Sequence, residues 1–228
     1  MCIKRQTLGG SLNYARFDAE GLRGQQLRDQ LLQQINANNN ITSMTDAVCN
    51  AWFADNWLPI IRGKRLYKVR AKQVILCTGA LEQQAVFHNN DLPGVMMSSA
   101  AQRLIHLYGI RPGSAAVIVT GNNDGYANAL DLLDAGVQVK AIVDLRDTPA
   151  QDAISKAIAA RGVRILTGHA VFAAQKTNNH LSGVDIRPIT STGICGPQSE
   201  SISCDLLCMA VGYTPTYQLV CQAGGQLS

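Results

Sequence analysis

The stretch that decides the fold is Ser114–Arg146, SAAVIVTGNNDGYANALDLLDAGVQVKAIVDLR. Its first part, Ala115–Thr120, is a short run rich in β-branched residues and predicts a buried parallel strand. After a turn at Gly121, apolar residues return at helical spacing as far as Gly136, a residue typical of helix C-termini. A second apolar run then ends at Asp144. The stretch therefore predicts a βαβ unit of the kind that binds dinucleotides.

The turn after the first strand lacks most of the glycines that hold a pyrophosphate. Counting G-x-G-x-x-G from Gly121 puts Asn123 and Tyr126 where the second and third glycines belong, which opposes ligand approach and close helix–strand packing. Asp124 adds a negative charge at the helix N-terminus, where phosphate would be favoured. Asp144 stands where such units bind a ribose hydroxyl. Two interpretations stay open: Gly121 and Asp144 contact a cofactor, or the unit is structural and holds no ligand.

Length and composition indicate a globular chain. Its 228 residues suffice for one or two domains, and 46% hydrophobic with 16% charged residues exclude disorder. No apolar run approaches the roughly 18 residues that cross a bilayer, and the N-terminal sequence lacks the apolar core of a signal peptide. The odd count of seven cysteines favours free buried thiols in a reducing compartment. We therefore expect a cytoplasmic protein with no membrane partner.

The polar residues indicate neither nucleic-acid binding nor a metal site. The net charge is only +4, and the one basic cluster, Arg62–Lys72, is interpreted as a solvated face because no binding motif accompanies it. Cys204 and Cys208 lie in a strand-like run, where they would stand about 13 Å apart, without a nearby histidine. No nucleophile–base pair is found, so no catalytic residue is assigned. The histidines are interpreted as structural or surface residues: His88, His106, His169 and His180.

Further helices and strands are predicted around the βαβ unit. The predicted helices are Leu22–Ile35, Met97–Tyr108 and about Ala150–Ala160. An antiparallel meander is predicted between Ile41 and Leu76, with Val74–Cys77 as its final strand. The later predicted strands are Val163–Leu166, a hairpin of Ala170–Gln175 and Leu181–Ile186 around Asn178-Asn179, and Ser201–Val211.

Four motifs carry a resemblance to a known family. The run KQVILCTGA, the motif FHNNDLPGVM and the turn TGNNDGY lie within 71–144, and CDLLCMAVGYTPTYQLVCQAGGQL lies at 204–227. In this combination and order the chain resembles the alpha subunit of heterotetrameric sarcosine oxidases. The wider group includes two-component amine, proline and opine dehydrogenases.

The resemblance implies a glutathione-reductase-like FAD/NAD(P)-binding α/β fold. A three-layer Rossmann-like domain, 113–200, is expected as an insertion in an incomplete first dinucleotide-binding domain, 1–112 with 201–228, which carries the antiparallel β meander. Family members place a strand, a full G-x-G-x-x-G turn, a helix and a second strand before the glycine pair matched here by Gly9 and Gly10. The sequence is therefore expected to be a piece, or a truncated product, of a longer subunit.

The resemblance also implies a site for a first dinucleotide, NAD in the family with FAD as an alternative. Without the first glycine loop, binding is expected to be weak or absent. The residues implied to approach the dinucleotide are Gly9 and Gly10, Thr78 and Gly79, and the late stretch Gly212, Tyr213, Thr214 and Pro215.

The function implied is that of a fragment of a sarcosine-oxidase-type oxidoreductase, which demethylates sarcosine or a related secondary amine oxidatively. In the family the beta subunit carries FAD, and the alpha subunit supplies scaffold and NAD; the isolated chain is expected to be inactive. The alternative is a non-catalytic docking module without a cofactor, which self-associates through uncovered apolar surface at Leu22–Ile35 and Val74–Cys77. A conventional NAD-dependent dehydrogenase is least favoured, because a working fingerprint is lacking.

Overall fold

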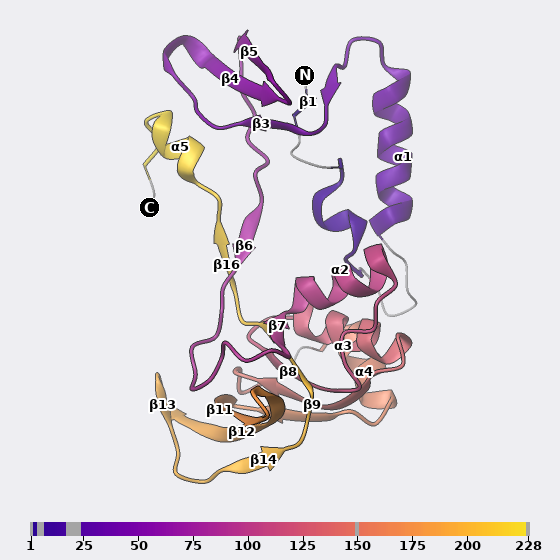
Figure 1. Cartoon of the computed structure of the whole chain (residues 1–228), viewed down its shortest axis with the longest axis vertical. Coiled ribbons are helices and arrows are strands. Elements are labelled where there is room, and N and C mark those ends of the chain that lie inside the picture. Colours follow the sequence, from indigo (N-terminus) through magenta and orange to yellow (C-terminus); the bar gives the residue numbers. More distant parts are fainter. Residues whose placement is uncertain (1, 4–6, 17–23, 149–150, 227–228) are drawn as a thin grey trace. The chain divides into compact units, whose positions relative to one another are not determined.

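The computed structural model describes residues 2–3, 7–16, 24–148 and 151–226 (Figure 1). The chain divides into two compact units, each assembled from separate segments. The first unit comprises Met1–Leu12, Gln25–Leu81 and Thr214–Ser228, and the second comprises Asn13–Gly24 and Glu82–Tyr213. The second unit is larger than the predicted insertion 113–200, because segments on both sides of that range add strands and a helix to its sheet. The predicted domain bounds stay a prediction.

The first unit contains the predicted antiparallel meander. Three of its strands pair in sequence order around a small core of Met44, Ala47 and Ile60. Its helix α1 (Gly24–Ala37) covers most of the predicted one, whose start at Leu22 lies outside the described residues. The strands are β1 (Cys2–Ile3), β2 (Ser43–Met44), β3 (Ala47–Cys49), β4 (Trp57–Arg62) and β5 (Arg65–Arg70).

The predicted strand Val74–Cys77 is not a strand. The described part of the chain offers it no ladder partner, and Ile75 is 87% exposed. An extended run becomes a strand only when a neighbour completes its hydrogen bonds. Apolar composition alone was therefore insufficient, and the prediction is wrong at this segment.

The second unit is built on a five-stranded parallel sheet with the order β10-β9-β8-β15-β7. The predicted strands at 115–120 and 163–166 and the one ending at Asp144 are confirmed. β8 is almost wholly buried, as a strand covered on both faces requires. The bounds are β7 (Val95–Met97), β8 (Ala115–Thr120), β9 (Gln138–Asp144), β10 (Arg164–Thr167) and β15 (Leu206–Ala210).

Helices cover one face of this sheet (Figure 1). Tyr126, Leu130 and Ile158 from the helices pack with Ile118 and Ile142 from the strands. The helices predicted at 97–108 and before Gly136 are confirmed. The helix predicted from about Ala150 begins at Ala153, because Asp152 accepts a hydrogen bond from the backbone N–H of Ser155 there. Ala150 itself lies outside the described residues. The bounds are α2 (Ser98–Tyr108), α3 (Asp124–Asp134) and α4 (Ala153–Ala160).

An antiparallel sheet covers the other face, which completes the three predicted layers. Val171, Val184 and Ile186 from this sheet pack against Val117 and Leu207 of the parallel strands. The predicted hairpin is confirmed, and its turn residues Asn178 and Asn179 both have positive φ, as a tight hairpin turn needs. The strands are β11 (His169–Thr177), β12 (His180–Ser191), β13 (Ile194–Cys195) and β14 (Glu200–Ile202).

The predicted single strand Ser201–Val211 is divided between two layers. β14 pairs with β12 in the antiparallel sheet, whereas β15 pairs with β7 and β8 in the parallel one. Between them Asp205 accepts hydrogen bonds from the backbone nitrogens of Ser114 and Ala115, at 3.0 and 2.7 Å. The apolar run is continuous in the sequence, but the chain passes from the antiparallel sheet to the parallel sheet within it.

Shorter elements complete the described chain. They are a 3-10 helix at Gly10–Asn13, another at Ala54–Asn56, the paired strands β6 (Ala80–Glu82) and β16 (Tyr213–Pro215), and helix α5 (Gln218–Gln222). None of the helices that the structure describes is long and apolar enough to cross a bilayer.

Candidate functional site

Two of the predicted dinucleotide-binding segments meet in the first unit. The Thr78 hydroxyl donates to the carbonyl of Thr216 at 2.9 Å, and the Thr216 hydroxyl donates to the carbonyls of Thr78 and Gly79 at 2.8 and 2.7 Å. The backbone N–H of Thr216 also donates to the Gly79 carbonyl at 3.0 Å. We call this arrangement the Thr78–Thr216 clasp. It holds Thr78 and Gly79 against Thr216, the residue that directly follows Thr214 and Pro215.

Open backbone at two predicted glycines fits the approach of a ligand. Gly79 and Gly10 have φ values of +74° and +56°, and a Cβ built on either would meet no atom within 4 Å. Gly9, with φ of 107°, accepts a hydrogen bond from the N–H of Leu12 where the 3-10 helix begins. Glycine at such positions lets a ligand reach the main chain without a side chain in the way. These residues therefore fit a dinucleotide.

Gly212 and Tyr213 belong to the second unit and have partners there. The Gly212 carbonyl accepts a hydrogen bond from the N–H of Gln83 at 2.9 Å. The Tyr213 hydroxyl donates to the Asp124 carboxylate at 2.6 Å. Burial raises the pKa of Tyr213, and the hydrogen bond to Asp124 raises it further. The Tyr213 side chain is thus held at the N-terminus of α3.

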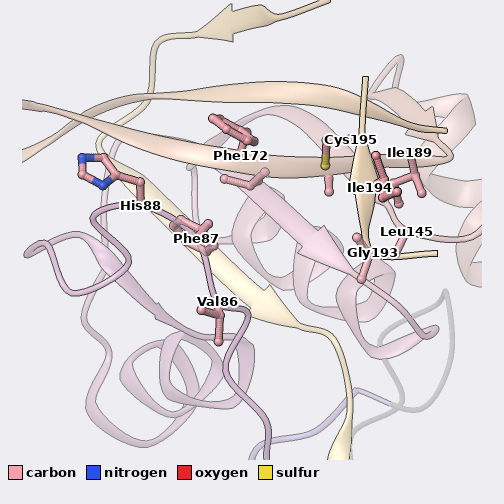
Figure 2. A pocket seen from close by; sticks show the side chains of 11 residues that line it. Val86, Phe87, His88, Leu145, Phe172, Ile189, Gly193, Ile194 and Cys195 are labelled. Atoms are coloured by element: carbon pink, nitrogen blue, oxygen red, sulfur yellow. The ribbon is translucent and has the colours of Figure 1, made fainter. Parts of the chain in front are cut away.

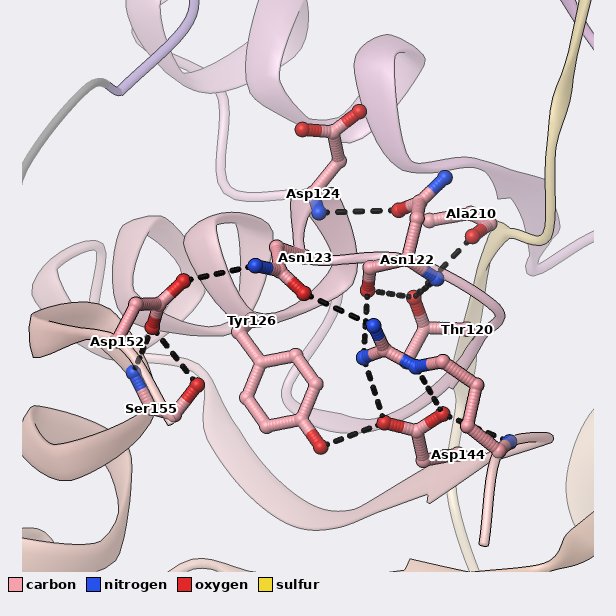
Figure 3. Close-up of polar contacts among 10 residues, drawn as sticks. Thr120, Asn122, Asn123, Asp124, Tyr126, Asp144, Asp152, Ser155 and Ala210 are labelled. Carbon is pink, nitrogen blue, oxygen red and sulfur yellow. Dashed lines mark hydrogen bonds and ion pairs between the residues drawn. The ribbon is translucent and has the colours of Figure 1, made fainter. Parts of the chain in front are cut away.

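At the carboxyl end of β9, Asp144 is fully buried and bound by its own unit (Figure 3). The Arg146 guanidinium binds it with two parallel hydrogen bonds, Nε to Oδ1 at 3.0 Å and Nη2 to Oδ2 at 2.8 Å. The Tyr126 hydroxyl donates to Oδ2 at 2.7 Å. Burial and this carboxylate raise the pKa of Tyr126, and the hydrogen bond to Asp144 raises the pKa of Arg146. Asp144, which was predicted to bind a ribose hydroxyl, is therefore hydrogen-bonded to residues of its own unit.

The turn before α3 is bound in the same network. Arg146 Nη1 donates to Asn123 Oδ1 at 3.0 Å, and Asn123 Nδ2 donates to Asp152 at 2.9 Å. The Asn122 side chain accepts from the N–H of Asp124 at 3.0 Å. The turn residues thus bond to Arg146 and to the N–H of Asp124.

The glycines of this turn face protein rather than open space. A Cβ on Gly121 would lie 2.8 Å from the Val211 carbonyl oxygen, and one on Gly125 would lie 2.4 Å from Cβ of Thr120. The close helix–strand packing expected of the third glycine is made by Gly125, one residue before the motif position at Tyr126. The glycine four residues after Gly121 was the signal that could have shown this.

A buried ionic cluster in the second unit was not predicted. Asp131 on α3 lies 3.1 Å from Nε2 of His106 and 3.3 Å from the guanidinium of Arg16, with all three side chains at most 5% exposed. Gln102 donates to the same carboxylate at 2.9 Å. These contacts fix the segment after Asn13 on α2 and α3. They arise between residues far apart in sequence, which no local pattern reveals.

An apolar groove of 670 Å³ lies between the hairpin and the segment before β7 (Figure 2). Of its lining residues, His88 lies at one end, and Cys195 lies between Phe172 and Ile194 (Figure 2). Cys204 and Cys208 are buried elsewhere, and burial raises the pKa of both thiols to about 12. The groove is lined by Val86, Phe87, His88, Leu145, Ala170, Val171, Phe172, Ile189, Gly193, Ile194 and Cys195.

Curated relatives of the chain are sarcosine oxidase alpha subunits. The chain is 36% identical over 163 residues to that of Rhizobium meliloti (strain 1021) and 35% identical over 165 residues to that of Corynebacterium sp. (strain P-1). Each match covers 72% of this chain, but only 15% and 17% of the relatives' own length.

Solved structures confirm the predicted fold class. Thioredoxin reductase of T. acidophilum superposes with a TM-score of 0.74 at 17% identity, covering 99% of this chain and 73% of that one. L-proline dehydrogenase of P. horikoshii gives a TM-score of 0.65 at 21% identity, covering 99% and 39%. The family model described as pyridine nucleotide-disulphide oxidoreductase matches residues 8–227. The chain therefore belongs to the pyridine nucleotide-disulphide oxidoreductase family.

Proposed function

We propose that the chain is the dinucleotide-binding part of the alpha subunit of a sarcosine-oxidase-type flavoenzyme, and that its first unit binds NAD. The observation that carries this proposal is the Thr78–Thr216 clasp beside the open backbone of Gly79. The one-third identity to sarcosine oxidase alpha subunits supports it.

In this proposal the chain binds and orients the cofactor. NAD supplies a nicotinamide that accepts or donates hydride when bound. The hydroxyls of Thr78 and Thr216 hold the loop in shape, and the glycine backbones admit the ligand. No described residue is assigned to amine oxidation. We therefore propose that sarcosine, or a related secondary amine, is oxidised on a partner beta subunit that carries FAD.

A calorimetric titration of the purified chain with NAD⁺ tests the proposal. Thr216→Val removes the hydroxyl that donates to Thr78 and Gly79, and we expect roughly tenfold weaker binding, about 1.4 kcal/mol. Thr190→Val is the matched control, because the Thr190 hydroxyl donates only to Ile194 in the second unit. Absence of binding by the wild type, or equal effects of the two substitutions, contradicts the proposal.

A second candidate function is a docking module without a cofactor. Exposed apolar side chains favour it: Ile75 is 87% exposed, and Leu27 and Leu31 of α1 are 50% and 42% exposed. Such a module is expected to self-associate at high concentration and to leave NAD⁺ unbound. Light scattering on the purified chain measures its oligomeric state. It separates the two candidates, because a monomer that binds NAD⁺ excludes the docking module.

A further inference from the structure

We propose that the Arg146 side chain occupies the place where a dinucleotide would bind to the second unit, and that it thereby excludes a second dinucleotide. In open parallel sheets, ligands bind at the carboxyl ends of the strands, beside a helix N-terminus. The corresponding place in this chain, called the nucleotide crevice below, is at the ends of β8 and β9 beside the start of α3. The inference goes beyond the proposed NAD site of the first unit and does not depend on it.

The carboxylate that would recognise a ribose is already satisfied. Both Asp144 oxygens accept from the Arg146 side chain, Oδ1 accepts again from the Arg146 N–H at 3.0 Å, and Oδ2 accepts from Tyr126. Asp144 is fully buried. A ribose hydroxyl can reach this carboxylate only after the guanidinium leaves it.

The guanidinium also joins the end of β9 to the turn before α3. From Asp144 it reaches Asn123 Oδ1 at 3.0 Å and the Asn122 carbonyl at 3.4 Å. Asn123 in turn is held by Asp152 at the start of α4. The Arg146 side chain, which is 34% exposed, reaches solvent together with the exposed Asn123. It therefore lies where a ligand would enter.

The phosphate position is occupied by negative charge. Asp124 opens α3, its N–H donates to the Asn122 side chain, and its carboxylate is held by the Tyr213 hydroxyl. A carboxylate here repels a pyrophosphate and already occupies the favourable end of the helix dipole. The glycines of the turn add no space, because Gly121 and Gly125 face Val211 and Thr120.

Displacing Arg146 would leave a buried carboxylate without its cation. Loss of one partner from a buried ion pair costs enough to weaken an association by about two to three orders of magnitude. We therefore expect the wild-type crevice to bind NAD⁺ with a dissociation constant above roughly 1 mM. Removal of the guanidinium should allow binding of the adenosine half, which needs Asp144 but not the phosphate donors.

Peptide-resolved hydrogen exchange of the full chain tests this, with millimolar NAD⁺ or adenosine as probes. In the wild type we expect no protection at 121–126 with either probe. In Arg146→Gln we expect protection of that segment by adenosine. Arg146→Lys, which keeps a cation beside Asp144 but cannot make both parallel bonds of the guanidinium, is the second variant if the first does not fold, and we expect weaker protection of the segment by adenosine in it. Arg164→Gln is the matched control, because Arg164 pairs with Glu200 at an exposed site.

The outcomes separate the two proposals. Protection of 121–126 by NAD⁺ in the wild type overturns the inference, as does a folded Arg146→Gln variant that gains no protection. Protection in the Arg164→Gln control would also overturn it, because the gain would then not come from the crevice. Missing protection by NAD⁺ at 78–79 and 214–216 instead counts against the proposed function and leaves the crevice inference standing.

Discussion

At the scale of single residues, we expect the hydroxyl of Tyr126 to make a large contribution to the free energy of unfolding. It donates to Asp144, a carboxylate that is fully buried. A hydrogen bond to a buried charged group contributes about 1.5–3 kcal/mol, so we expect Tyr126→Phe to lower the free energy of unfolding by about that amount. Tyr213→Phe is the control, because the partner of Tyr213, Asp124, is exposed. Urea unfolding that gives equal losses for both variants contradicts this assignment.

Single positions were the hardest to predict from the sequence. The place of Asp144 at the end of β9 could be predicted because its distance from the turn is fixed by the βαβ repeat. Its bond to Arg146, only two residues away, depends on a side-chain conformation that no pattern encodes. The close contact of α3 with Thr120 is likewise made by Gly125, which lies one residue before the motif position at Tyr126.

At the scale of elements, the packing of α3 on β8 depends on Gly125. A Cβ at this position would lie 2.4 Å from Cβ and 2.5 Å from Oγ1 of Thr120. We therefore expect Gly125→Ala to destabilise the chain by about 1–3 kcal/mol, as overpacking does. The double variant with Thr120→Ala, which removes Oγ1 and Cγ2 of Thr120 and keeps its Cβ, should lose less than the sum of the two single losses. Additive losses in denaturant unfolding would show that this contact does not limit the helix.

Elements were predicted well where local periodicity alone decides them. β8, α3 and β9 follow from the apolar spacing of Ser114–Arg146, and the hairpin follows from the Asn178-Asn179 turn. Val74–Cys77 has the same apolar character but lacks a neighbouring strand, and strand formation is a property of pairs. The run Ser201–Val211 reads as one strand because its change of layer depends on a contact of Asp205 with β8, which is distant in sequence.

At the scale of the whole molecule, the glycines of the two candidate cofactor regions differ in their surroundings. Gly10 and Gly79 of the first unit face open space, whereas Gly121 and Gly125 of the second face protein atoms. We propose that the first unit presents a region that admits a dinucleotide, and that side chains of the second unit fill the corresponding region. The sequence predicted the type of fold, but the difference between the units depends on packing across the sheet.

The number of NAD⁺ molecules bound per chain tests this account most directly. Equilibrium dialysis of the purified chain against NAD⁺, up to about 1 mM, measures it without assumptions about enzymatic activity. We expect one molecule per chain, bound by the first unit. No bound NAD⁺ would contradict the proposed site at the Thr78–Thr216 clasp, and two would contradict the closure of the second crevice by Arg146.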